Sequence, residues 1–308
     1  MEINNNILND LFKMTKDIIN KELNIYHYNS DIIHLLYIII PAFIIKYNIK
    51  NQNKIINTFK EVPIKLINKE DRVHQAYYTS IPNIINNKIV TRKYIGINFY
   101  KEKNLLELID NIVHEYNHAL NSLINEISEK KNTFSLRTGL TRTIYYKDSS
   151  KRPYKDDAYI LEEIINTKQT EEIVDIINSF SNYQILDNEI SNTLYSINTS
   201  INKKYSSGAY YLQAAICKEL MNNKTLISVL SNMRLNGNID EIPYFFDNIT
   251  GIDNSYNKLI SILQETIKEE DNYSKSKWFK SIKLNKIRSL YKDAKNIIDT
   301  FNSNYHFK

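Results

Sequence analysis

Apolar residues recur along most of this chain at spacings of three and four, which is the spacing of one face of an α-helix. The pattern predicts a run of N-terminal helices, which includes the strongly apolar stretch 32–45, and helices over nearly all of the chain beyond residue 157. Three short stretches between them are rich in β-branched and aromatic residues and are bounded by Asn, Lys and Pro, which is typical of strands. These predicted strands cover 62–67, 75–81 and 89–100.

The elements group into three parts with soft boundaries. N-terminal helices cover 1–60, a central part with a small mixed sheet covers 61–180, and a C-terminal helical lobe covers 181–308. No repeat of fixed period and no Gly/Ser-rich or Pro-rich linker separates these parts. We therefore expect an α+β fold, mostly α, packed as one compact unit.

Composition narrows the class of protein. Hydrophobic residues make up 42% and charged residues 24% of the 308 residues, which is typical of a globular chain rather than a disordered one. Forty Lys and Arg against 35 Asp and Glu give a net charge of +5. This charge is spread along the chain instead of gathering in a basic stripe, so the sequence carries no strong nucleic-acid signal.

Location and redox chemistry follow from three features. The single cysteine, Cys217, cannot form an intrachain disulfide and lies among apolar neighbours, which indicates an inert core thiol. A reducing compartment or a disulfide-free exported protein fits this cysteine content. The N-terminus lacks the cationic start and apolar run of a secretory signal. The apolar stretch 32–45 falls short of the roughly 20 residues that a spanning helix needs. We expect a cytoplasmic protein with no membrane span.

The most regular pattern covers 104–129, where apolar residues form one stripe and Asn104 with Glu107 makes a capping-box arrangement. It predicts one helix with the sequence His114-Glu115-Tyr116-Asn117-His118, an HExxH motif, at its centre. Because residues four apart lie one turn apart on the same face, the two imidazoles can bind one ion. Glu115 is placed to accept a proton from a metal-activated water.

A third ligand is needed to complete such a metal site. No histidine follows His118 at the short HExxHxxGxxH spacing, because position 124 is Ile. The alternative is an acidic residue on a later helix, and the predicted helix around 161–167 offers Glu163 and its neighbour Glu162. Asp156 or Asp157 can cap this helix.

On these motifs the stretch from about 85 to 180 resembles the gluzincin group of zinc metallopeptidases, in which a glutamate on the next long helix completes HExxH. The resemblance implies a zincin-like core and one Zn²⁺ per chain, bound by His114, His118 and Glu163. Glu162 is the alternative ligand and stands where the group usually has Asn. The strand over 89–100 resembles the sheet edge that bounds the group's substrate cleft.

Two further features of the gluzincin group are less clearly matched. The group stabilises the oxyanion with a Tyr or His, and the candidates here are Tyr159, Tyr210 and Tyr211, each of which has core packing as its alternative. The group's acidic residue four positions after the ligand glutamate is replaced by Thr167. Asn166, or a residue elsewhere, is left to orient His114.

Between the two motif helices, 133–147 has the pattern of a hairpin or strand pair with a backbone turn at Gly139. Arg137 and Arg142 in this stretch are candidates for binding a substrate carboxylate, and a surface or sheet-edge role is the alternative. The charged stretch 147–157 is typical of an exposed loop.

The sequence thus predicts a zinc-dependent hydrolase that cleaves a peptide or protein substrate, with Glu115 as general base. Two other interpretations remain open. One is a catalytically silent or regulatory HExxH protein that binds a metal or a partner. The other is a helical nucleic-acid-associated protein in which the motif is coincidental.

Overall fold

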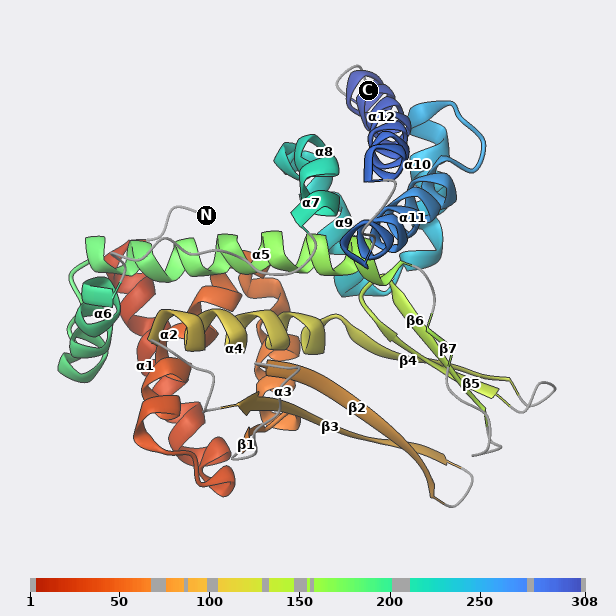
Figure 1. Cartoon of the computed structure of the whole chain (residues 1–308). Coiled ribbons are helices and arrows are strands. Elements are labelled where there is room, and N and C mark those ends of the chain that lie inside the picture. The colour runs from red at the N-terminus through yellow and green to blue at the C-terminus, as the bar shows by residue number, and fades with distance from the viewer. Residues whose placement is uncertain are drawn as a thin grey trace. The chain divides into compact units, whose positions relative to one another are not determined.

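The computed structural model describes residues 4–67, 76–85, 88–98, 105–128, 133–146, 154–155, 158–200, 211–275 and 280–305 (Figure 1). These residues are mostly helical and include two small sheets, which confirms an α+β, mostly α fold. The chain forms two compact units, each built from two separate stretches. Unit 1 combines Met1–Leu120 with Gln169–Ser206, and unit 2 combines Asn121–Lys168 with Ser207–Lys308. These divisions differ from the boundaries near 60 and 180 that the sequence pattern suggests.

Unit 1 is organised around one buried helix, α2 (Ser30–Tyr47). Among the described residues it is the one helix long and apolar enough to cross a membrane, but most of it is buried within the unit. Other helices of unit 1 pack against it or beside it. They are α1 (Asn5–Ile18), η1 (Ile19–Leu23), η2 (Asn24–Tyr26), η3 (Ile49–Asn51), α3 (Gln52–Glu61), α4 (Leu105–Leu120), η4 (Phe180–Asn182) and α6 (Asn188–Ser200).

The sheet of unit 1 has three strands in the order β1-β3-β2. β1 (Ile64–Ile67) runs parallel to β3 (Lys88–Asn98), and β2 (Ala76–Ile85) runs antiparallel to it. The expectation that 89–100 forms the sheet edge is therefore wrong: β3 is central, and β2 is an edge strand that contacts α4. The cause is β1, which pairs with the far side of β3 and so encloses it.

Helix α4 is shorter than the sequence pattern predicts. It ends at Leu120, and Ser122–Ser128 forms strand β4 instead of continuing the helix to 129. The apolar residues Leu123 and Ile127 fit a helical stripe, but pairing with β5 makes this stretch a strand, with an irregularity in the register between Asn125 and Ile127. The predicted N-cap, Asn104, lies outside the described residues.

The sheet of unit 2 is antiparallel, with four strands in chain order: β4, β5 (Thr133–Thr138), β6 (Thr141–Tyr146) and β7 (Tyr154–Lys155). The predicted hairpin is confirmed, because β5 and β6 are joined by a two-residue turn at Gly139 and Leu140. Gly139 has φ +56°, a left-handed conformation that glycine adopts without steric cost. Apart from β7, the predicted loop 147–157 lies outside the described residues.

Helix α5 (Tyr159–Ser179) is one unbroken helix that is shared by the two units. Its residues up to Lys168 belong to unit 2, and its residues from Gln169 onward belong to unit 1. The remaining helices of unit 2 enclose an apolar core that includes Leu161, Phe246 and Phe301. They are α7 (Tyr211–Ile216), α8 (Lys218–Asn222), α9 (Lys224–Asn236), η5 (Ile239–Glu241), α10 (Ile242–Thr250), α11 (Ser255–Lys275) and α12 (Lys280–Tyr305).

Cys217 belongs to this core and is fully buried, which raises the pKa of its thiol to about 12. Because the thiolate is the reactive form, we expect the native protein to resist modification by iodoacetamide at pH 8, and the unfolded chain to take up one label. Mass spectrometry of native and urea-treated protein measures both. Rapid labelling of the native protein would show that Cys217 is accessible.

Candidate metal centre

Packing of α4 fixes the direction in which its two histidines point. Tyr116, on the opposite face of the helix, is buried; its ring stacks on Phe59 with centroids 3.9 Å apart. Its hydroxyl donates a hydrogen bond of 2.9 Å to the backbone carbonyl of Val62. With that face anchored, His114 and His118 lie one turn apart with their ring centroids 4.8 Å apart. His118 is buried and His114 is partly exposed.

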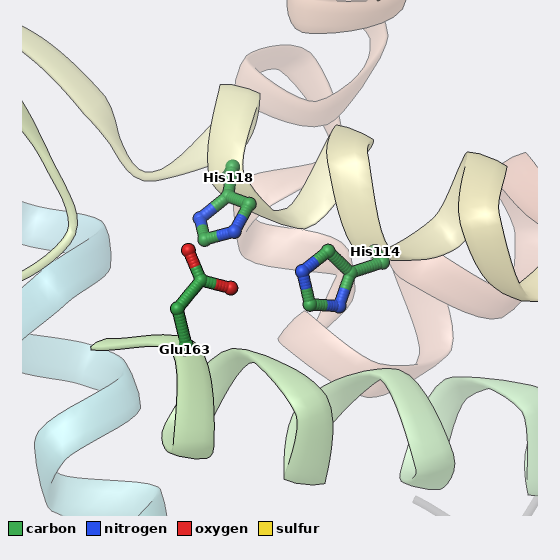
Figure 2. A group of neighbouring side chains, drawn as sticks. All are labelled: His114, His118 and Glu163. Carbon is green, nitrogen blue, oxygen red and sulfur yellow. The ribbon is translucent and has the colours of Figure 1, made fainter. Parts of the chain in front are cut away.

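Glu163 joins the two histidines from the first turns of α5. One ligand atom from each of His114, His118 and Glu163 can be chosen such that all three lie within 4.8 Å of one another. Figure 2 shows the Glu163 carboxylate directed toward the two imidazole rings. Two imidazole nitrogens and one carboxylate oxygen form a donor set that zinc uses in hydrolytic centres. The predicted trio is thus brought together, and its chemistry fits a divalent metal.

Glu115 is also held in a defined place. Its carboxylate is 8% exposed, and Oε2 accepts a 2.6 Å hydrogen bond from the backbone N–H of Tyr78 on β2. Tyr78 pairs with Ile95, whose own N–H donates to Pro63 on the other side of β3. In an antiparallel ladder the backbone groups of such a pair both point away from each other. The outer edge of β2 therefore faces the HExxH helix at Glu115.

Glu162, the alternative ligand, is directed elsewhere. It is 1% exposed and forms an ion pair with the fully buried Arg234 of α9. Its Oε2 also accepts a 2.7 Å hydrogen bond from the N–H of Leu140 in the β5–β6 turn. A Cβ atom at Gly139 would overlap this carboxylate, so the absent side chain makes room for it. The structure groups Glu163, rather than Glu162, with the histidines.

Of the predicted oxyanion candidates, the structure describes only Tyr159 with its side chain. Tyr159 begins α5 and packs against the apolar core of unit 2. Tyr210 is outside the described residues, as is the side chain of Tyr211, the first residue of α7. The packing of Tyr159 fits core packing, the alternative considered for it. Asn166, one turn after Glu163, is fully buried.

The two arginines of the hairpin face each other across the β5–β6 ladder. Arg137 is buried and forms an ion pair with Asp240. That ion pair favours the structural role considered for Arg137 over substrate binding.

The residues that sequence reasoning missed are polar and buried. Arg234, which neutralises Glu162, and a hydrogen-bonded set formed by Tyr47, Asn117 and Gln169 carry no motif. Their sequence signal is limited to polar side chains at positions that a helical stripe would bury.

Comparison with known proteins finds no matching family model, no matching curated protein and no matching solved structure. The class of the site therefore comes from its own chemistry, which is that of a candidate divalent-metal centre made by two helices. An activity of this chain has to follow from the chemistry of His114, His118, Glu163 and Glu115.

Proposed function

We propose that this protein is a zinc metallopeptidase with a gluzincin-type centre and a zincin-like core. The observation that carries the proposal is the convergence of His114, His118 and Glu163, with Glu115 next to the first ligand. Three protein ligands leave a position for water or substrate, as catalytic zinc sites do. A zinc ion in this set supplies a Lewis acid for the peptide carbonyl and lowers the pKa of a bound water.

The chain's own acid–base group in this mechanism is Glu115. Its carboxylate removes a proton from the attacking water as the new C–O bond forms, and it delivers that proton to the amine nitrogen as the C–N bond breaks. The products are a carboxylic acid and an amine, and no covalent bond to the protein is needed. The hydrogen bond from the Tyr78 N–H keeps this carboxylate in one orientation.

A peptide is the substrate class that the surroundings of Glu115 favour. β2 is an edge strand, and the outward N–H of Tyr78 shows which residues of the strand point away from β3. By the alternation of the ladder, Ala76 and Ser80 also direct their backbone groups outward. An extended peptide can add to such an edge through main-chain hydrogen bonds. This arrangement supports a peptide or protein substrate beside the metal ligands.

One alternative draws on the same contact. If the Tyr78 N–H holds Glu115 away from water, the centre binds a metal without hydrolysing peptides, and the protein has a regulatory or binding role.

Cytoplasm is the proposed compartment, because a chain with one cysteine does not need an oxidising compartment to fold.

Metal content and peptide cleavage test the proposal together. We expect purified protein to contain about one zinc per chain and to cleave members of a peptide library, because the trio needs no further protein ligand. His118→Ala should lose both zinc and cleavage, since two remaining ligands bind weakly. Elemental analysis and mass spectrometry of the digest measure the two results.

His34→Ala is the matched control. His34 lies on α2 and bonds Glu189 at 2.7 Å, so its loss should leave zinc and cleavage unchanged. Wild-type protein that takes up no zinc would refute the metal centre. Zinc-loaded protein that cleaves no peptide would favour the regulatory role.

A further inference from the structure

A set of hydrogen bonds within unit 1 joins α2, α4 and the part of α5 that begins at Gln169. The Tyr47 hydroxyl of α2 donates to Asn117 Oδ1 of α4 and lies 3.2 Å from Gln169 Oε1 of α5. Asn117 Nδ2 donates to the same Gln169 oxygen at 3.1 Å. Asn117 and Gln169 are fully buried, and Tyr47 is nearly so. We call Tyr47, Asn117 and Gln169 the amide triad.

Two members of the triad, Asn117 and Gln169, lie on the two helices that carry the proposed metal ligands. Asn117 is inside the HExxH motif and directly precedes His118. Gln169 follows Glu163 by six residues on the unbroken helix α5, about 9 Å along its axis at 1.5 Å per residue. Because α5 is unbroken, fixing Gln169 against α4 also fixes how far along the helix axis Glu163 lies.

Burial makes this set sensitive to register. A buried amide that loses its hydrogen bonds pays the cost of desolvation without compensation. Sliding α5 along α4 by one turn, about 5.4 Å, would separate Gln169 from both of its partners. An ion pair between Lys46 and Glu172 joins α2 to α5 next to the triad. It also favours the present position of α5. One register of α4 against α5 is thus strongly preferred.

We propose that Tyr47, Asn117 and Gln169 are positioning residues of the metal centre: they fix the register in which Glu163 meets His114 and His118. The inference rests on the proposed metal site but not on peptide hydrolysis. None of the three side chains is assigned a contact with the metal or the substrate. Their effect is on metal affinity and on the coordination geometry.

Two tyrosine substitutions give a matched test. Tyr47→Phe removes the triad hydroxyl, whereas Tyr26→Phe removes a hydroxyl of η2 that donates to the backbone carbonyl of Lys60 and is assigned no role at the metal centre. Each variant removes one hydroxyl donor from unit 1, so both should lower stability. Partners that orient metal ligands typically contribute 10–100-fold to metal affinity. We expect Tyr47→Phe to weaken Co²⁺ binding about 10-fold and Tyr26→Phe to change it less than about 2-fold.

The measurement uses full-length protein, Co²⁺ as the probe, chelator competition for affinity and the visible absorption bands for geometry. Gln169→Leu, which removes the acceptor shared by both partners, should weaken binding by up to about 100-fold and shift the bands. Tyr47→Phe keeps the inference testable if Gln169→Leu fails to fold.

Unchanged affinity in Tyr47→Phe, or an equal loss in Tyr26→Phe, would overturn the positioning role while leaving the metal centre intact. Failure of the wild type to bind Co²⁺ would instead overturn both the inference and the proposed function. Normal Co²⁺ binding without peptide cleavage would refute the peptidase alone.

Discussion

Glu115→Gln is expected to stop peptide cleavage while the zinc stays in place. The substitution keeps the size of the side chain and an oxygen that can accept the Tyr78 N–H, but it removes the group that takes a proton from water. General acid–base groups contribute about 10²–10⁴-fold to rate, so kcat/KM should fall by about 10³-fold. Peptide-cleavage kinetics and zinc per chain are measured on the same preparation.

Glu107→Gln supplies the control on the same helix. Glu107 lies in the first turn of α4, two turns before the motif, and its substitution should leave the rate within about 2-fold of wild type. Unchanged cleavage in Glu115→Gln would refute Glu115 as general base. Loss of zinc together with activity would instead assign Glu115 a role in holding the site together.

Arg234→Met is expected to lower the free energy of unfolding far more than Lys275→Met does. It leaves the Glu162 carboxylate buried without its counter-charge, and breaking a buried ion pair in this way costs about 3–5 kcal/mol. Urea unfolding gives the change in the free energy of unfolding. We expect the added change Glu162→Gln to recover most of the loss, because the charge is removed and an acceptor for the Leu140 N–H remains.

Lys275→Met is the matched control for Arg234→Met. Lys275 pairs with Asp271 four residues earlier on α11, and both side chains are mostly exposed. Exposed pairs of this kind contribute about 0.5 kcal/mol or less, so the control should be close to wild type. Equal losses in the two variants would show that burial does not strengthen the effect of the Glu162–Arg234 pair.

The metal trio could be predicted because its geometry is local to two helices. The HExxH spacing alone places His114 and His118 on one face, and a later helix with adjacent glutamates supplies the third group. The choice between Glu162 and Glu163 needed the structure, since neighbours on a helix point in directions about 100° apart and the deciding partner, Arg234, lies 72 residues away.

The remaining differences have the same origin in long-range pairing. The stretch 122–128 continues the helical spacing of the preceding residues, but pairing with β5 makes it a strand. The order β1-β3-β2 depends on a parallel pairing that no local pattern encodes. Tyr47 meets Asn117 across 70 residues of chain and Gln169 across 122, so the amide triad leaves no motif in the sequence.

Gly139 and Gly251 both have a positive φ, +56° and +64°. Gly139 lies in the β5–β6 turn, and Gly251 is the C-cap of α10. Their surroundings give them different tolerance of substitution. A Cβ at Gly251 would meet nothing within 4 Å, so asparagine, which accepts that backbone conformation, has room there. At Gly139 the same change would drive an atom into the Glu162 carboxylate, beside Glu163. The smallest residue of the hairpin thereby becomes a structural requirement of the helix that carries Glu163.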